Sequence, residues 1–206
     1  MKQKTIIKII KVLNKLYGFR YQKQKPFKVL IGVVLSQRTN DDISFPATYR
    51  LIKKAKNIDG ILKLSEREIE KIIYPTCFYR NKAKRIKEIC RILKEKYRGK
   101  VPATREELMK LPGVGGKSAD IVLSYVYRRP VIACDTHVIW ISNQLGWTKS
   151  KDPEKVREDL HKIIPIKYRQ TLNDYLVQLG REICKTGRPK CKICPIKKYC
   201  SDIKPL

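Results

Sequence analysis

Residues 111–120 form the stretch Leu-Pro-Gly-Val-Gly-Gly-Lys-Ser-Ala-Asp, and this stretch decides the fold. Pro112 ends the helical pattern before it, and a second helical pattern begins at Ser118. Gly113, Gly115 and Gly116 permit the positive φ angles and close backbone approach of a tight hairpin. The backbone N–H groups of such a hairpin point outward at a helix N-terminus and can bind a phosphate group. A plain turn between helices would need only one glycine, so the stretch predicts a phosphate-binding hairpin.

The rest of the chain also shows helical patterns. Apolar residues recur every three to four positions over residues 5–17 and stop at Gly18, and Pro26 opens an apolar run that ends at Leu35. Two capping boxes start further helices, Ser65 with Glu68 and Thr104 with Glu107. Other helices are expected over residues 81–97 and 118–127, from Asp152-Pro153 onward, and over 168–184. Only residues 131–133 resemble a strand, so the sequence predicts an all-α fold.

The charge of the chain indicates a polyanionic partner. Its 206 residues carry 47 Lys and Arg against 19 Asp and Glu, a formal net charge of +28 that is spread along the whole sequence. Nucleic acid fits best, because basic residues that neutralise phosphates release condensed counterions. A solvated Lys-rich surface of the thermophile kind is the alternative, although such surfaces usually balance Lys with Glu. No apolar stretch is long enough for a membrane span or a signal peptide, so we expect an intracellular, soluble protein.

The chain has seven cysteines, and because we expect it to be cytosolic, a disulfide framework is not predicted. Cys77, Cys90 and Cys134 lie among apolar neighbours and are interpreted as ordinary buried thiols. The other four follow the pattern C-x6-C-x2-C-x5-C and are Cys184, Cys191, Cys194 and Cys200. Structural zinc sites usually show two short knuckles, whereas iron–sulfur ligation tolerates wider loops. The loop between these cysteines is basic, and we expect it to contact a DNA backbone.

A second polar motif, Cys134-Asp135-Thr136-His137, precedes an apolar run over residues 138–141. The common reading of an aspartate in this place is a helix N-cap, and that role is compatible with chemistry because a capping carboxylate is held rigidly ionised. His137 is interpreted as a packing or hydrogen-bonding residue.

These motifs together resemble the helix-hairpin-helix DNA glycosylase superfamily, and the resemblance covers nearly the whole chain. The hairpin with its closing Lys117, followed by a Gly/Pro-rich loop and Asp135, resembles the bifunctional endonuclease III branch. The cysteine spacing matches the [4Fe–4S] motif of endonuclease III residue for residue. The resemblance implies Lys117 and Asp135 as catalytic residues, the four cysteines as cluster ligands, and DNA contacts at Gly113, Val114, Gly115 and Gly116.

The implied chemistry explains why a lysine belongs at position 117. A neutral amine can attack the sugar C1′, expel the base and form a Schiff base, after which loss of a C2′ proton eliminates the 3′ phosphate. Asp135 would stabilise the cationic sugar-like transition state. The amine must be unprotonated, and burial together with the net positive charge would lower its pKa, whereas bound phosphates would raise it.

Two further loops resemble those with which endonuclease III enters the duplex, residues 35–41 and 77–83. A flipped-out nucleotide leaves a gap that a side chain must fill. Arg38 stands where the family has a plugging Gln, with Gln37 one place earlier, and Phe78 stands where the family has a wedge Leu. Without the resemblance, Phe78 and Tyr79 would be interpreted as core aromatics.

The resemblance implies two helical lobes. One is a six-helix barrel with the hairpin over residues 22–129, and the other combines residues 1–21 and 130–206 around the [4Fe–4S] cluster, with a DNA cleft between them. The implied function is base excision repair: removal of oxidised pyrimidines from duplex DNA, followed by cleavage 3′ to the abasic site. We expect a monomer in the cytoplasm, associated with the nucleoid, whose partner is double-stranded DNA with damaged bases or abasic sites.

Two alternatives stay open. A mismatch or adenine DNA glycosylase would share the hairpin, the aspartate and the cluster, but Lys117 argues against the mismatch branch, and the adenine branch normally carries an additional C-terminal domain. A non-catalytic DNA-binding redox sensor would explain the charge and the cysteines, but it gives no reason for Lys117 and Asp135 together.

Overall fold

The structure, a computed structural model, describes residues 3–18 and 24–200. These residues form α-helices and two short 3-10 helices without any β-strand, which confirms the predicted all-α fold class. The chain divides into two compact units, Lys23–Tyr127 and a discontinuous unit of Met1–Gln22 with Arg128–Leu206. The lobe boundary predicted after residue 21 lies outside the described residues. Within the described parts of the chain, no helix is both long and apolar enough to cross a membrane.

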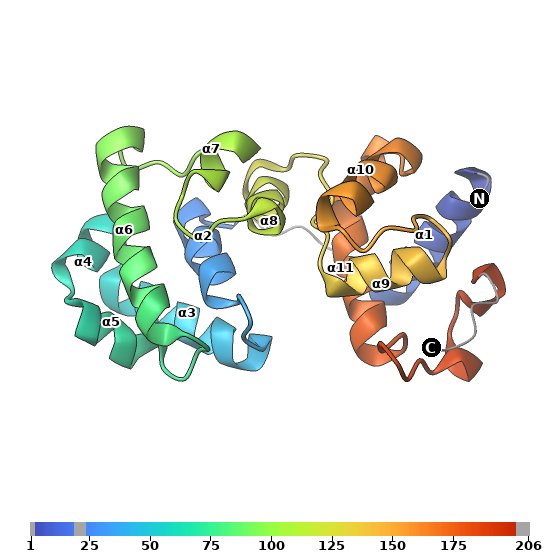
Figure 1. Cartoon of the computed structure of the whole chain (residues 1–206), viewed down its shortest axis with the longest axis horizontal. Coiled ribbons are helices and arrows are strands. Elements are labelled where there is room, and N and C mark those ends of the chain that lie inside the picture. Colours follow the sequence, from blue (N-terminus) through green and yellow to red (C-terminus); the bar gives the residue numbers. More distant parts are fainter. Residues whose placement is uncertain (1–2, 19–23, 201–206) are drawn as a thin grey trace. The chain divides into compact units, whose positions relative to one another are not determined.

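The unit Lys23–Tyr127 is a bundle of helices packed around α2 (Figure 1). Its described helices are α2 (Pro26–Leu35), α3 (Asp41–Ala55), α4 (Ile58–Lys63), α5 (Glu66–Ile73), α6 (Tyr79–Tyr97), α7 (Arg105–Met109) and α8 (Gly116–Tyr127). Helix α2 contacts α3, α6 and α8, and its side chains Leu30, Ile31 and Val34 are fully buried. A helix that is apolar on nearly all sides is stable only when other helices surround it, which explains its central place.

The predicted helices over residues 81–97, 118–127 and 168–184 each begin two residues earlier in the structure, and the two predicted capping boxes have different outcomes. Ser65 and Glu68 form the predicted capping box in full. Thr104 accepts a hydrogen bond from the backbone N–H of Glu107, but the returning bond is absent. The Glu107 carboxylate is instead engaged by the hydroxyl of Tyr97 and by Lys110. The prediction of a second capping box was therefore half wrong, because two nearby donors took the carboxylate.

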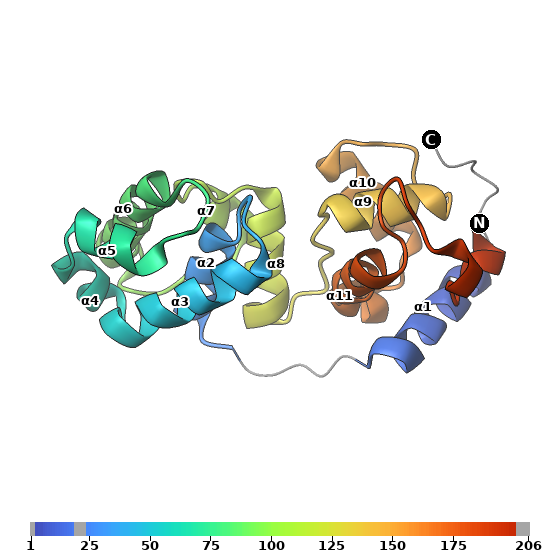
Figure 2. The same ribbon diagram turned by 90° about the horizontal axis from the view of Figure 1, so that it is seen from below.

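The discontinuous unit contains α1 (Gln3–Tyr17), α9 (Thr136–Gln144), α10 (Pro153–Ile163), α11 (Ile166–Glu182) and the 3-10 helices η1 (Cys191–Ile193) and η2 (Lys197–Tyr199). Helix α11 packs against α1 and α9 (Figure 2). The apolar stripe of α1 lies in this core, with Ile6, Ile9, Ile10 and Leu13 at most 1% exposed. Each such side chain contributes about 1.5–3 kcal/mol on burial, so the N-terminal helix is firmly held in a unit formed mainly by the C-terminal half.

Candidate functional site

The predicted hairpin joins α7 to α8. Gly113 has a φ of 73°, so this position requires glycine, whereas Gly115 and Gly116 are not in the left-handed region. Of the three glycines that could permit positive φ, only Gly113 uses this freedom. A Cβ added at Gly115 would meet nothing within 4 Å, so the turn is open to an approaching molecule there. The Val114 side chain is 4% exposed and anchors the turn in the core.

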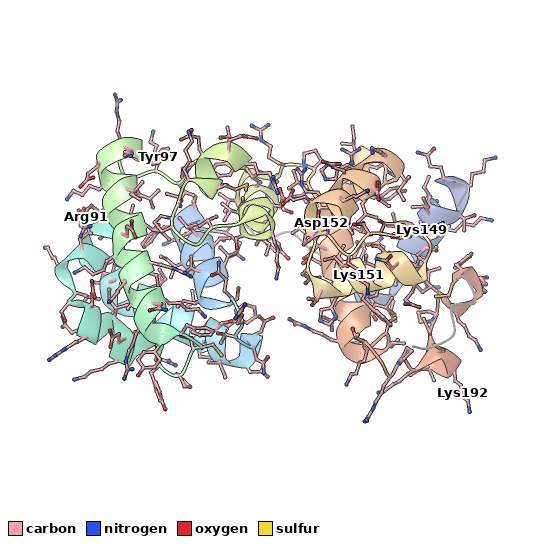
Figure 3. The ribbon with its side chains drawn as sticks, in the orientation of Figure 1. Arg91, Tyr97, Lys149, Lys151, Asp152 and Lys192 are labelled. Atoms are coloured by element: carbon pink, nitrogen blue, oxygen red, sulfur yellow. The ribbon has the colours of Figure 1, made fainter. Side chains whose placement is uncertain are left out.

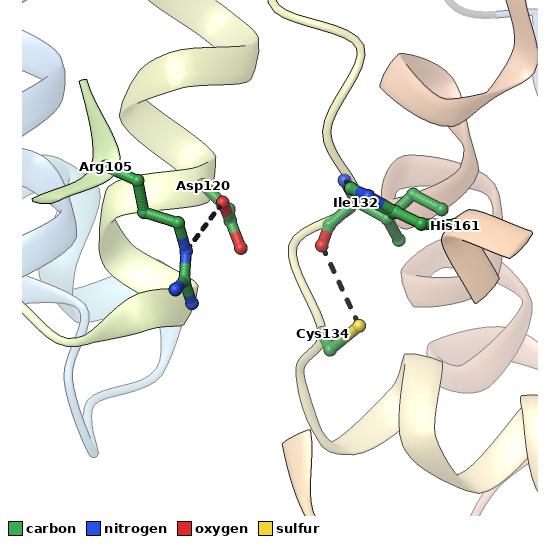
Figure 4. A network of polar contacts seen from close by, with 5 residues as sticks. All are labelled: Arg105, Asp120, Ile132, Cys134 and His161. Atoms are coloured by element: carbon green, nitrogen blue, oxygen red, sulfur yellow. Dashed lines mark hydrogen bonds and ion pairs between the residues drawn. The ribbon is translucent and has the colours of Figure 1, made fainter. Parts of the chain in front are cut away.

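Lys117 lies in the first turn of α8, directly after this open turn, and its side chain is exposed. The burial that we expected for this amine is absent in the structure. One turn further along α8, Asp120 is 1% exposed and forms an ion pair with Arg105, with 3.2 Å between Nε and Oδ1 (Figure 4). This pair ties the start of α7 to α8 on either side of the hairpin.

Gln37 reaches the hairpin from the loop that follows α2. Its side-chain amide donates to the carbonyl oxygen of Gly113 at 2.6 Å and to the hydroxyl of Ser118 at 3.4 Å. Beneath the same turn lies Arg85, whose Cδ would be 3.0 Å from a Cβ on Gly113. In this conformation the Gln37 amide therefore holds the hairpin.

Arg38 and Phe78 lie at the tips of two loops and meet there. The guanidinium carbon of Arg38 is 5.8 Å from the centroid of the Phe78 ring, and both side chains are exposed. Both residues adopt left-handed backbone conformations, with φ of 50° and 55°. Such a conformation costs a non-glycine residue about 1–2 kcal/mol. The alternative that Phe78 is a core aromatic was wrong, since the ring is 60% exposed.

Sequence reasoning missed Lys82, and it misplaced Cys77. Lys82 lies in α6 and is 2% exposed, although a lysine in an amphipathic helix normally faces solvent. Burial, assisted by the nearby Arg85 charge, lowers the pKa of the Lys82 ammonium to about 8.

Cys77 is exposed, not buried as predicted, because it belongs to the turn before α6. Cys90 and Cys134 are buried as predicted.

Asp135 caps α9, as the sequence predicted: its Oδ1 accepts from the backbone N–H of Val138 at 2.9 Å. The extended segment before it is held from two helices. The Ile132 N–H donates to Nε2 of His161 in α10 at 3.2 Å (Figure 4), and Asn173 of α11 donates to the Ala133 carbonyl at 2.7 Å. Asp135 therefore projects from a braced backbone.

His137, two residues later, packs against α11. Its Nδ1 lies 2.3 Å from the place where a Cβ on Gly180 would be, so α11 can approach α9 only because residue 180 is glycine. This contact supports the interpretation of His137 as a packing residue.

The four C-terminal cysteines lie at the end of the discontinuous unit. Cys184 follows α11, Cys191 begins η1, Cys194 follows η1 and Cys200 follows η2. They are free thiols, and the described residues hold no group of three or more His, Cys, Asp or Glu arranged around a single metal ion. Lys192 extends outward from the loop (Figure 3). The basic side chains of this loop are exposed to solvent.

The surroundings of these thiols bear on whether they could bind an iron–sulfur cluster. Burial raises the pKa of Cys184, Cys194 and Cys200, the last to about 11, and the neighbouring cysteines raise these pKa values further. Hydrogen bonds from the backbone at Ile196 and Lys197 act in the opposite direction on Cys194. The indole N–H of Trp140 is buried and makes no regular hydrogen bond among the described residues. It lies near the Cys184 thiol and lowers the pKa of that thiol. Thiols that lie near enough to raise one another's pKa, with N–H groups acting on two of them, fit a group that binds thiolates.

Comparison with known proteins identifies the class. The family described as "HhH-GPD superfamily base excision DNA repair protein" matches residues 31–166. Endonuclease III of Thermotoga maritima is 41% identical over 195 residues, which cover 95% of this chain and 92% of that protein. Among solved structures, a non-covalent endonuclease III–DNA complex superposes with a TM-score of 0.89 and a trapped endonuclease III–DNA covalent intermediate with 0.88. Both are 35% identical to this chain, cover 97% of it, and are themselves covered to 95% and 96%.

The chain therefore belongs to the endonuclease III family of the HhH-GPD superfamily, as its hairpin and cysteine spacing predicted.

Proposed function

We propose that this protein is a bifunctional DNA glycosylase and AP lyase that removes oxidised pyrimidines from duplex DNA. The family membership supports the reaction class. The observation that carries the proposal is the place of Lys117: an exposed amine on the first turn of α8, directly after a hairpin that is open at Gly115.

The hairpin would hold the DNA backbone beside this amine. An open glycine turn that leads into a helix presents backbone N–H groups and the positive end of the helix dipole, which together favour a phosphate. The many basic residues of the chain supply further affinity for the duplex that does not depend on sequence. Bound DNA would also cover Lys117 and displace water from it. The free protein does not provide this desolvation, because the side chain is exposed.

In the proposed reaction the Lys117 nitrogen attacks C1′ of the damaged nucleotide. The glycosidic C–N bond breaks, and the base leaves with that electron pair and gains a proton. The C1′–O4′ bond of the sugar then breaks, O4′ gains a proton, and C1′ and the Lys117 nitrogen form a Schiff base. Removal of a C2′ proton expels the 3′ phosphate by β-elimination, and water finally releases the lysine. Asp135 would stabilise positive charge on the sugar and help transfer protons.

The proposed cofactor is a [4Fe–4S] cluster bound by Cys184, Cys191, Cys194 and Cys200. When bound, such a group would hold the segment after α11 as a folded loop, since a cluster cross-links its ligands. The protein's own contribution is the orientation of the thiols by the backbone at 196–197 and by Trp140, and the outward basic side chains that could contact phosphates.

Double-stranded DNA with damaged bases or abasic sites is the proposed partner, and a monomer acting in the cytoplasm at the nucleoid is the proposed state. Two solved structures with which the chain superposes at 35% identity are endonuclease III–DNA complexes, which supports the partner. The alternatives of a mismatch or adenine glycosylase and of a redox sensor are not favoured, because neither explains the lysine beside the hairpin as well as lyase chemistry does.

Borohydride trapping tests the proposal. The wild-type chain, incubated with a duplex that contains an oxidised pyrimidine and then reduced, should form a covalent protein–DNA adduct. Lys117→Gln should abolish the adduct, while Lys94→Gln should not, since Lys94 is an exposed lysine of α6 paired with Asp59. An undiminished adduct in Lys117→Gln would remove this lysine from the mechanism, and no adduct in the wild type would contradict the lyase activity itself.

A further inference from the structure

Lys82 is a buried cation whose hydrogen-bond partners are neutral oxygens. Its Nζ donates to the carbonyl oxygens of Leu35 at 2.7 Å and Gln37 at 2.8 Å, and to the hydroxyl of Thr39 at 2.9 Å. These three bonds use all three donors of the ammonium group. Burying such a group is costly unless its hydrogen bonds are complete. A buried ammonium group whose donors are all used holds the groups that accept from it in fixed positions.

The three acceptors belong to the last residue of α2 and to the loop after it, which carries Arg38. Gln37 and Thr39 flank Arg38 directly, so the ammonium group binds the backbone on one side of it and the side chain on the other. Arg38 has a φ of 50°, which a non-glycine residue adopts only when its surroundings hold it there. The bonds from Lys82 supply that constraint.

The same contact point reaches the second loop. The Thr39 hydroxyl, besides accepting from Lys82, accepts from the backbone N–H of Cys77 at 3.1 Å. Cys77 immediately precedes Phe78, the other residue with a left-handed backbone at the tips, with a φ of 55°. Lys82 itself lies one turn into α6, and Phe78 is the N-cap residue of that helix. One ammonium and one hydroxyl thus connect the two loops below the tips.

We infer that Lys82, through Thr39, is a positioning residue that holds the Arg38 loop and the Phe78 loop together, so that their tips contact DNA as a single pair. The 5.8 Å contact between the guanidinium carbon and the ring centroid is the product of this arrangement. The pair presents a planar cation over an aromatic ring, and such a pair can fill the gap that an absent or flipped base leaves in a duplex. The inference deepens the proposed function and rests on it.

The same helix supplies a matched control. Lys87 also lies in α6 and donates to a backbone oxygen, that of Leu64, at 2.6 Å. Leu64 directly follows α4 as its C-cap and is not part of either loop. Loss of Lys87 therefore removes a lysine-to-carbonyl bond from the same helix without touching the loops.

The experiment measures preference for a gap in the duplex separately from chemistry. Fluorescence anisotropy gives the dissociation constants for a duplex with a tetrahydrofuran abasic-site analogue and for the undamaged duplex, and thermal unfolding is measured for every variant. The preference is the dissociation constant for undamaged duplex divided by that for the abasic-site duplex. Lys82→Met should lower this ratio at least tenfold and leave affinity for undamaged duplex within about twofold. Thr39→Val should lower the ratio about threefold to tenfold, whereas Thr39→Ser, which keeps the hydroxyl, should restore it.

Lys87→Met should retain the wild-type preference, even where it loses as much thermal stability as Lys82→Met. A Lys82→Met variant that is folded and keeps the preference would overturn the inference. Should Lys82→Met fail to fold, Thr39→Val compared with Thr39→Ser decides, and equal ratios in these two would overturn it. A wild-type chain without any preference for the abasic-site duplex would instead count against the proposed function, and the inference would fall with it.

Discussion

Gln37 donates its side-chain amide to the carbonyl oxygen of Gly113 across 2.6 Å, although the two residues are 76 positions apart. The bond joins the loop that carries Arg38 to the hairpin that carries Lys117. The carbonyl that Gln37 engages belongs to Gly113, the glycine of this hairpin that adopts a left-handed backbone conformation. Two parts of the proposed site thus share one hydrogen bond.

Loss of that bond should impair both parts. Gln37→Leu keeps a similar volume and removes the donor, and a hydrogen bond of this kind contributes about 0.5–1.5 kcal/mol. We expect a decrease of about threefold to tenfold in kcat/KM for lyase activity on a duplex with an abasic site. Gln178→Leu is the control, because its amide donates to Glu182 within the same helix, α11, and to no other described residue. Unchanged kinetics in Gln37→Leu would mean that the hairpin holds its shape alone.

Packing of α11 against α9 should depend on Gly180. In Gly180→Ala the new methyl group would lie 2.3 Å from Nδ1 of His137, so the free energy of unfolding should fall by about 1–2 kcal/mol despite the better helix propensity of alanine. Urea unfolding measures the change. The double variant Gly180→Ala/His137→Ala should regain part of it, and Gly115→Ala, with nothing within 4 Å, should be nearly neutral. A stable Gly180→Ala would contradict the close contact.

The buried Lys82 should give the stability a specific pH dependence. Burial lowers the pKa of this ammonium from 10.5 to about 8, so between these values the unfolded chain binds a proton that the folded chain has released. The free energy of unfolding then rises with pH over this window. Lys82→Met lacks the group, and the wild-type value minus the variant's value should therefore increase from pH 8 to pH 10 in urea unfolding. A difference that stays flat or falls would show that the folded pKa is not lowered.

Most of the fold could be predicted because helix periodicity and caps are local. The cap at Asp135 and the capping box at Ser65 depend on residues three positions apart. The capping box at Thr104 failed because Tyr97, outside that window, competes for Glu107. Lys82 could not be predicted at all, since its burial depends on two carbonyl groups and a hydroxyl that lie 43 to 47 positions away. The meeting of Arg38 and Phe78 depends in turn on that buried lysine.

Arg38 should favour guanine as the base opposite the lesion. A guanidinium group has five donors and no acceptor, and guanine offers two acceptors, O6 and N7, where adenine pairs an acceptor with a donor. Single-turnover rates of lesion removal should be roughly tenfold higher opposite guanine than opposite adenine. Arg38→Gln has both a donor and an acceptor and should bring the two rates closer together. Arg80→Gln is the control, because Arg80 is likewise stacked on an aromatic ring, that of Tyr79. Equal narrowing in both variants would assign the preference to charge alone.

Asp135 combines a capping role with a proposed catalytic one, and a single substitution can separate them. Asn caps a helix about as well as Asp, because its side-chain oxygen can accept from Val138 in the same way. Asp135→Asn should therefore change the free energy of unfolding by no more than about 0.5 kcal/mol. It removes the negative charge, however, so glycosylase activity should fall by about a hundredfold or more.

Asp152 provides the matched control, since its Oδ1 caps α10 by accepting from the backbone N–H of Lys155 at 2.8 Å. Asp152→Asn should leave both stability and activity near the wild-type values. If Asp135→Asn behaved like Asp152→Asn, Asp135 would be a cap and nothing more. If it lost stability as well as activity, the loss of activity could follow from a displaced α9, and only Asp135→Asn with an intact fold isolates the charge. The decisive measurement is therefore activity and unfolding on the same preparation of each variant.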